Sequence, residues 1–304
     1  MKLNTRKNYF CKMKYSVFFL AFILLSCEKK INIQPDTQKP LLVVDGNIEN
    51  GKDPVVILSK SIEYFSSLNT NAILNSLVKN ATVTLSNGSK TIKLKQYSLS
   101  FGGGYSIVYY TNDSTNPSAA IKGELGKSYT LQIDFEGQKY VSTTSIPLVK
   151  RTCDSVWWKK APFTDDSSKV VLMGRFTDPK GYGNYVRYFT KVNSDNYLPG
   201  INSVFDDQVI DGSTYDFQVD QGVDRNNIPD QKEYGYFKRG DTISLKLSNI
   251  DKASFDFWRT LEFSYQSVGN PFSSPTKVMS NVSNGALGAF CGYGSQVRTV
   301  IVPK

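Results

Sequence analysis

The chain has 304 residues, a length that predicts two domains, with 36 Lys and Arg, 27 Asp and Glu and no His. Apolar residues at 40% and charged residues at 21% are the proportions of a globular protein, not of a disordered one. Without histidine, Ser-His-Asp triads, Cys-His dyads and imidazole–metal sites are excluded, and only lysine or a carboxylate could activate a serine nucleophile.

The formal net charge of +9 is concentrated at the N-terminus, where five Lys and Arg and no acid lie in the first 26 residues. The remaining chain has no basic stripe that could displace many phosphate counterions. The sequence therefore predicts no nucleic-acid partner.

Residues 17–25 are nine consecutive apolar residues, which suits a signal peptide and is too short to span a bilayer. They run into Leu24-Leu25-Ser26-Cys27, which resembles the lipobox of a bacterial lipoprotein. The resemblance implies a signal peptide over residues 1–26, cleavage before Cys27 and attachment of fatty-acyl chains such as palmitate to this cysteine. An uncleaved membrane anchor is the alternative. Met13 opens a shorter form of the same leader, so the chain starts at Met1 or Met13.

Residues 27–39 are mostly polar and predict a tether between the membrane and a folded domain. Short apolar runs follow at residues 41–44 and 55–58, separated by Asp-Gly and Asn-Gly turns. Many short strands with such turns and no helical periodicity between them predict an antiparallel sandwich over residues 40–147.

Two β-hairpins are the clearest local signals in this first domain. Residues 81–85 and 91–95 alternate between apolar and polar side chains on either side of Asn87-Gly88. Residues 129–133 and 139–142 flank Gly137 in the same way. Tyr129 lies where immunoglobulin-like domains place a corner tyrosine, so we expect a structural latch there.

The second half, residues 148–304, predicts a larger β-rich domain with one short helix. The predicted strands are residues 170–176, 185–192, 241–247 and 297–302. The helix begins after Asp251 as N-cap, with Phe255, Trp258, Leu261 or Glu262, and Tyr265 on one face, although a strand is also compatible with the aromatic spacing.

Cys153 and Cys291 are the cysteines that remain once the leader is removed and Cys27 carries lipid. In a cell-envelope compartment they could form a disulfide, and the alternative is two separately buried thiols. Two cysteines without histidine are not a zinc site.

Trp157 and Trp158 are candidate platforms for a sugar or another ring. Neighbouring residues on a strand point to opposite faces, so at most one of the two is expected to face outward. The alternative is a core residue beside a residue that covers a contact between domains.

Asp220, Asp224 and Asp230 lie in an acidic segment, residues 206–233, and carry the oxygen ligands that Ca²⁺ prefers. Their spacing does not follow the EF-hand pattern, and a solvated acidic loop is the alternative. No cofactor is expected.

Several motifs together resemble the domain of unknown function 4249 family. They include Leu42-Val43-Val44-Asp45-Gly46-Asn47-Ile48, residues 80–85 and 126–131, Asp154-Ser155, the stretch 178–185, and Gly269-Asn270-Pro271-Phe272, followed by residues 280–282, 285–290 and 292–293. The resemblance implies an envelope lipoprotein with an immunoglobulin-like or transthyretin-like N-terminal domain and a β-rich C-terminal domain. It also implies a companion of TonB-dependent outer-membrane receptors and transfers no catalytic residue.

We therefore expect a binding protein, not an enzyme, anchored by lipid to the outer membrane and facing the periplasm or the cell surface. Its expected partner is a TonB-dependent transporter or receptor. The alternatives are a surface glycan-binding or adhesion module and a hydrolase that uses two carboxylates.

Overall fold

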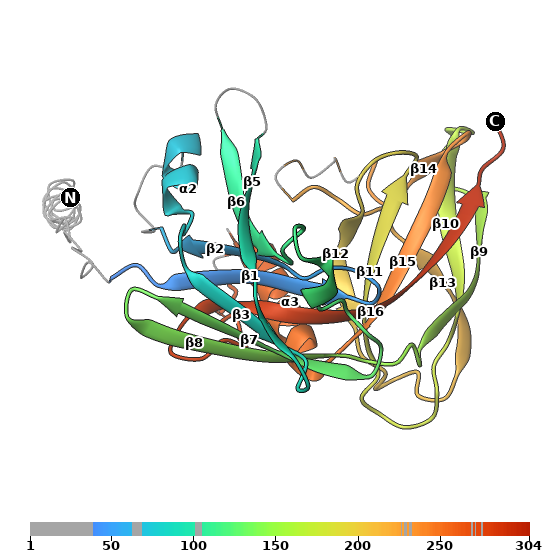
Figure 1. The fold of residues 1–304 in the computed structure, drawn as a ribbon. Helices are drawn as coiled ribbons and strands as arrows, with labels where there is room; N and C mark the ends of the chain where they lie inside the picture. The colour runs from blue at the N-terminus through green and yellow to red at the C-terminus, as the bar shows by residue number, and fades with distance from the viewer. Residues whose placement is uncertain are drawn as a thin grey trace, which may run out of the picture. The chain divides into compact units, whose positions relative to one another are not determined.

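The computed structural model describes residues 39–304, apart from 63–68, 101–104, 226, 228–229, 231–232, 269, 271 and 275. The predicted leader, Cys27 and most of the tether lie outside these residues. Residues Pro40–Lys304 form one compact unit. Strands dominate it, in three sheets, with two α-helices among the described residues (Figure 1).

The largest sheet has eight strands in the order β12-β11-β15-β16-β1-β2-β6-β5. Its strands are β1 Leu42–Glu49, β2 Val55–Lys60, β5 Lys95–Ser100, β6 Ser106–Thr111, β11 Tyr185–Val192, β12 Leu198–Phe205, β15 Thr242–Ile250 and β16 Leu287–Ile301. The second sheet contains β9 Thr152–Lys160, β10 Lys169–Thr177, β13 Thr214–Val219 and β14 Phe237–Lys238. The third contains β3 Thr82–Ser86, β4 Thr91–Lys93, β7 Lys127–Phe135 and β8 Gln138–Ile146.

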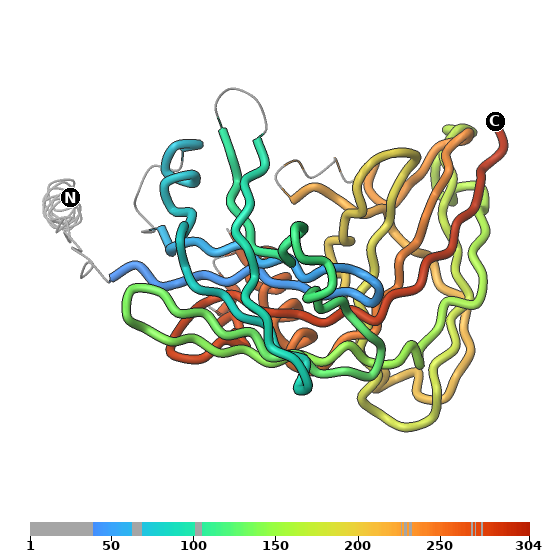
Figure 2. The backbone as a smooth tube through the Cα atoms, viewed as in Figure 1, coloured from blue at the N-terminus to red at the C-terminus, as the bar shows by residue number. Residues whose placement is uncertain are grey.

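β16 joins the two halves of the chain. Its first half pairs in parallel with β1, where Gly46 lies opposite Phe290, and its second half pairs antiparallel with β15. Figure 2 shows β16 running first alongside β1 and then alongside β15. The eight-stranded sheet therefore draws on both predicted domains, and the boundary between residues 147 and 148 stays a prediction.

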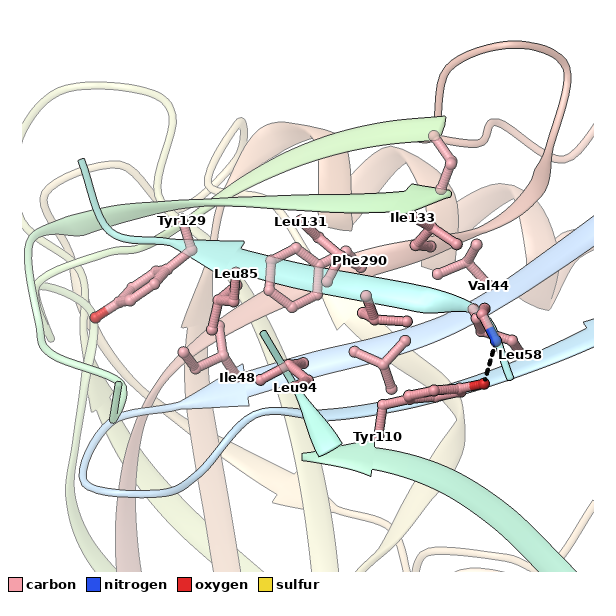
Figure 3. Packing of buried hydrophobic residues seen from close by; sticks show 14 of the residues in the cluster. Val44, Ile48, Leu58, Leu85, Leu94, Tyr110, Tyr129, Leu131, Ile133 and Phe290 are labelled. Carbon is pink, nitrogen blue, oxygen red and sulfur yellow. Dashed lines mark hydrogen bonds between the residues drawn. The ribbon is translucent and has the colours of Figure 1, made fainter. Parts of the chain in front are cut away.

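Each small sheet packs against the eight-stranded sheet through its own hydrophobic core, which gives the two predicted sandwich-like halves. The first core contains Val44, Leu58 and Phe290 from the large sheet and Leu85 and Leu131 from the third sheet (Figure 3). The second core lies between β10 and the pair β11 and β15. Both cores lie on the same face of the large sheet. A third core lies on the opposite face, under α3, and along β11 and β16 its residues alternate with those of the first two cores.

Both predicted hairpins are present, but the second strand of the first is shorter than predicted: β4 ends at Lys93, and Lys95 begins β5 of the eight-stranded sheet. β3 pairs with β4, with Leu85 opposite Ile92, and β7 pairs with β8 through a turn at Glu136 and Gly137. These two turn residues have φ of 49° and 75°, the left-handed conformation that tight hairpin turns require.

Tyr129 is the latch that its sequence position predicts. Its side chain is 1% exposed, its hydroxyl donates to the Lys122 carbonyl at 3.2 Å, and it accepts the Glu124 N–H at 2.7 Å. The buried ring thus fixes the segment that leads into β7.

The predicted helix is α3, Lys252–Ser267, and the Asp251 carboxylate accepts the Ser254 N–H at 2.8 Å as its N-cap. The predicted face is partly wrong: Phe255 is buried, but Phe257 is buried as well and Tyr265 is 58% exposed. Tyr265 lies in the last turn, where the Arg225 guanidinium lies 5.4 Å from its ring centroid.

A second helix, α2 Thr70–Ser76, has no counterpart in the sequence prediction. None of its residues is buried, so it lacks the apolar periodicity by which an amphipathic helix is detected. Among the described residues, neither helix combines the length and apolar character needed to cross a bilayer.

Candidate functional site

Cys153 and Cys291 are both free and buried. Cys153 belongs to the core between β10 and β11, whereas Cys291 belongs to the core beneath α3. Burial raises the pKa of each thiol to about 11. Of the two arrangements that the sequence allows, the structure has two separate thiols.

We expect both cysteines to be reduced in the native protein. A thiol reagent should label them only after unfolding, because burial blocks access and a pKa near 11 leaves little thiolate at neutral pH. The measurement is the number of thiols labelled in denaturant with and without prior reduction. Equal counts support the structure, and a gain of two thiols on reduction would contradict it.

The two tryptophans lie on β9 and point to opposite sides of their sheet, as neighbours on a strand should. Trp158 packs against the second core, and the Arg239 guanidinium lies 5.2 Å from its ring centroid. Trp157 is half-buried on the other side, with the Lys159 ammonium 6.0 Å from its ring centroid. Of the pair, Trp157 is therefore the residue available for a ligand.

The three predicted calcium ligands do not gather into one ion-sized group within the described residues. Asp220 is half-buried beside Tyr234. The pKa of Tyr234 is raised to about 12, mainly by burial and then by the charge of Asp220. Asp224 lines a cavity of about 430 Å³, and Asp230 is exposed. Although these three acids are close in the sequence, the fold does not bring their carboxylates together.

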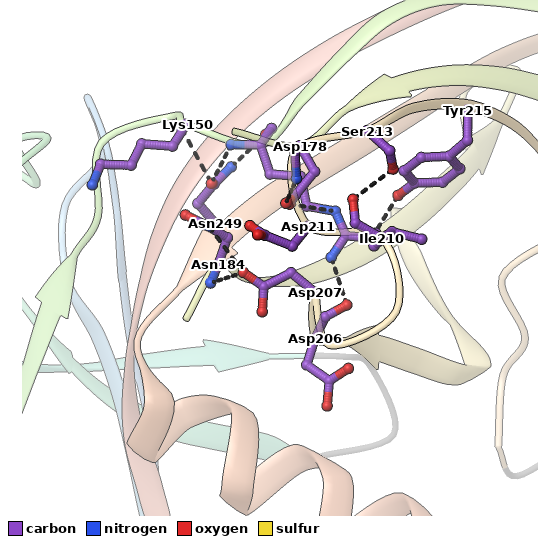
Figure 4. Close-up of polar contacts among 12 residues, drawn as sticks. Lys150, Asp178, Asn184, Asp206, Asp207, Ile210, Asp211, Ser213, Tyr215 and Asn249 are labelled. Carbon is purple, nitrogen blue, oxygen red and sulfur yellow. Dashed lines mark hydrogen bonds and ion pairs between the residues drawn. The ribbon is translucent and has the colours of Figure 1, made fainter. Parts of the chain in front are cut away.

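A different set of acids does converge. One carboxylate oxygen each from Asp178, Asp207 and Asp211 lies within 4.8 Å of the others (Figure 4). Asp178 comes from the Pro- and Gly-rich turn after β10, and the other two come from the loop after β12. Both segments are recognisable in the sequence as a turn and an acidic loop, but nothing in either indicates that they meet.

Asp207 is held by the turn that faces it. Its carboxylate accepts the Gly183 N–H at 3.1 Å and the Asn184 N–H at 2.8 Å. Burial alone would raise its pKa, but these donors outweigh burial and lower it below the usual value. Asp211 adds a third contact by accepting the Gly181 N–H at 2.6 Å.

Asp178 is in the opposite situation. Burial raises its pKa, and the Arg151 guanidinium opposes this. Arg151 Nε lies 3.6 Å from Asp178 Oδ1, and neither atom makes a hydrogen bond, although Arg151 also donates to the Asp206 carbonyl and the Tyr215 hydroxyl. The Arg151 guanidinium thus already supplies a positive charge to this group of acids.

This acidic cluster holds the turn after β10 against the loop after β12 through the contacts given above. Asp178 and Asp207 are only 2% and 1% exposed, so a polysaccharide could not reach them in this conformation. The cluster therefore gives no support to a hydrolase that uses two carboxylates, which must contact the glycosidic bond.

The face of the eight-stranded sheet that carries α3 also carries a row of charged and aromatic side chains. On β1, Asp45 is exposed, and Glu49 pairs with Lys246 of β15 at 3.2 Å. The Lys246 ammonium lies 4.6 Å from the Phe189 ring centroid and 5.1 Å from that of Tyr197. We call these five residues the charged sheet face.

Electrostatics couples the members of the charged sheet face. Loss of hydration raises the pKa of Asp45, and the positive charge of Arg187 partly offsets this rise. Burial lowers the pKa of Lys246, while Glu49 opposes the shift. Glu49 itself keeps a pKa below its usual value because Lys246 and Lys52 outweigh its burial.

Arg187 fixes the border between the charged sheet face and α3. It is 4% exposed, its guanidinium stacks 3.4 Å from the Trp258 ring centroid, and it donates to Ser203 and to the Tyr293 hydroxyl. The Trp258 indole N–H donates to the same hydroxyl at 2.9 Å. No signal in the sequence indicates this contact, because its four residues come from β11, β12, α3 and β16.

The model of a family described as a domain of unknown function, DUF4249, matches residues 28–299. No curated protein matches the chain. The match covers both halves of the eight-stranded sheet, including the pairing of β1 with β16. The chain therefore belongs to the DUF4249 family.

Proposed function

We propose that this protein is a lipid-anchored binding protein of the outer membrane and an accessory partner of a TonB-dependent transporter or receptor. The observation that carries the proposal is the order of its segments. An apolar run at residues 17–25 is followed closely by Cys27, then by a short polar stretch, and a compact unit begins at Pro40. An anchor of this kind confines the unit to one surface and raises its effective concentration for a neighbour in the membrane.

The charged sheet face supports a protein as the partner. Protein interfaces are enriched in aromatic residues, and complementary charges steer the partner and fix its register. Phe189 and Tyr197 are half-buried, and Asp45 is an exposed acid on β1, elsewhere on the same face of the sheet. A receptor surface with a basic side chain opposite Asp45 would fit this arrangement.

We expect the full-length tagged protein, cross-linked in cells and solubilised in detergent, to retain a TonB-dependent receptor. Asp45→Asn should lower the recovered receptor about threefold or more, because a charge at the edge of an interface mainly sets the rate of association. The measurement is quantitative mass spectrometry of the recovered proteins.

The matched control is Asp165→Asn, which changes another exposed acid, on the loop between β9 and β10. It should leave the recovery unchanged. Recovery of no receptor above background by the unmodified protein would overturn the proposed function.

A surface glycan-binding module is the second candidate, because Trp157 lies on the outer side of its sheet beside Lys159. In that case Trp157→Ala would abolish binding on a glycan array and leave receptor recovery unchanged. Trp158→Ala does not test this function cleanly, since Trp158 packs against the second core.

A further inference from the structure

A cavity of about 390 Å³ lies on the same face of the eight-stranded sheet as Asp45, at the end formed by β5 and β6. Its volume is within the range of small-molecule sites. Its lining includes Asp53, Tyr97, Tyr109, Asn112, Asp113 and Lys122.

Two tyrosines form one wall of the cavity. Tyr97 and Tyr109 lie opposite each other on β5 and β6, with ring centroids 5.9 Å apart and planes inclined by 27°. Tyr97 is held in place because its hydroxyl accepts the Ser114 N–H at 2.9 Å. Tyr109 is half-buried, and its hydroxyl makes no hydrogen bond within the described part of the chain.

Two carboxylates supply acceptors. Asp53 Oδ1 accepts from the Asn112 amide at 2.7 Å, and Asn112 is itself fixed by the backbone of Ile121. Asp113 Oδ1 accepts from Lys95 at 2.9 Å and from the N–H and hydroxyl of Thr115. Lys95 and Thr115 lower the pKa of Asp113 to about 2, so it is ionised at neutral pH. The second oxygen of each carboxylate has no partner among the described residues.

We propose that this cavity binds a neutral saccharide of one or two rings. The C–H face of a sugar packs on the exposed part of the tyrosine wall, and its hydroxyls donate to the open oxygens of Asp53 and Asp113. Lys122 and the Tyr109 hydroxyl supply donors on the same wall. Two carboxylates line the cavity with one lysine, Lys122, that has no acidic partner among the described residues, so an acidic ligand is disfavoured.

The site does not depend on docking to a receptor. Its residues lie in the segments 53, 95–97 and 109–122, outside the charged sheet face as defined above. Loss of receptor recovery and loss of saccharide binding are therefore separate outcomes, and either can fail while the other holds.

The test uses the full-length lipidated protein in lauryldimethylamine oxide, a detergent without a sugar headgroup. Isothermal titration calorimetry is performed with maltohexaose, cellohexaose, xylohexaose, mannohexaose and laminarihexaose, and with trigalacturonate as the acidic probe. We expect at least one neutral oligosaccharide to bind and trigalacturonate to bind at least about tenfold more weakly.

Variants identify the site. Tyr109→Ala and Tyr109→Leu should weaken binding about tenfold or more, because Leu keeps apolar surface but not the ring. Tyr109→Phe keeps the ring and loses one hydroxyl donor, so it should weaken binding only about threefold. Asp53→Asn should weaken binding severalfold, and Trp157→Ala, on the second sheet, should have no effect. Thermal melting of each variant reports whether it folds.

Three results would overturn the proposal. These are no binding of any neutral probe by the unmodified protein, binding that survives Tyr109→Ala, and stronger binding of trigalacturonate than of every neutral probe. Loss of binding in Trp157→Ala alone would instead move the saccharide site to β9.

Discussion

Replacing Phe290 by Ala should lower the free energy of unfolding by about 3–5 kcal/mol, the cost of removing a large buried ring and leaving a cavity. Phe290 is 0% exposed and fills the first core from β16. Gly46 provides the space, because a Cβ there would lie 2.9 Å from the Phe290 ring. Chemical denaturation followed by fluorescence and far-ultraviolet circular dichroism measures the change.

This variant also tests whether the two halves unfold together. Because β16 pairs with both β1 and β15, both probes should report one shared transition at a lower denaturant concentration. Ile301→Ala, at the exposed end of the same strand, is the control and should change stability by less than about 1 kcal/mol. Two separate transitions would contradict a sheet shared by both halves.

Asp251→Ala should cost about 3 kcal/mol, more than the loss of an ordinary helix cap. One carboxylate oxygen caps α3 through the Ser254 N–H, and the other accepts the Thr144 hydroxyl and the Ser145 N–H, both at 2.8 Å. The same side chain therefore starts the helix and ties it to β8. Equilibrium denaturation of the purified protein measures the loss.

Asp251→Asn is the matched variant. Asn is as good an N-cap as Asp but carries no charge and only one acceptor oxygen, so we expect it to recover about half of the stability lost in Asp251→Ala. If both variants behaved like the unmodified protein, the link between α3 and β8 would be irrelevant to stability.

Local features of the fold could be predicted from the sequence because their signals span few residues. The alternation on either side of Asn87-Gly88 specifies one hairpin, and Glu136-Gly137 closes another. Tyr129 and Asp251 form the latch and the cap that their positions predict. Each depends on contacts within about 20 residues, where backbone geometry limits the alternatives.

The arrangement of these parts could not be predicted in the same way. The parallel pairing of β1 with β16 joins residues more than 240 positions apart, and the predicted strand at 297–302 covered only the end of β16. The sequence does not indicate what the glycines at 288, 292 and 294 contact. A Cβ on any of them would clash with backbone oxygens of Val44, Ser145 or Pro147, so they allow close strand contact.

The candidate sites show the same limit. The opposite orientation of Trp157 and Trp158 follows from strand alternation, which the sequence contains. The convergence of Asp178 with Asp207 and of Asp53 with Tyr109 depends on which loops and strands become neighbours. The density of acids in residues 206–233 predicts either a calcium site at Asp220, Asp224 and Asp230 or a solvated loop. The acids that converge are instead Asp207 and Asp211 of this segment and Asp178 of the turn after β10.

The mass of the N-terminal peptide most directly tests the proposed lipid anchor at Cys27. Protein extracted from native membranes should yield a peptide that begins at Cys27 and carries acyl chains on both the sulfur and the new amino group. A peptide that retains residues 17–25 and has an unmodified Cys27 sulfur would contradict the anchor and the proposed partnership that depends on it.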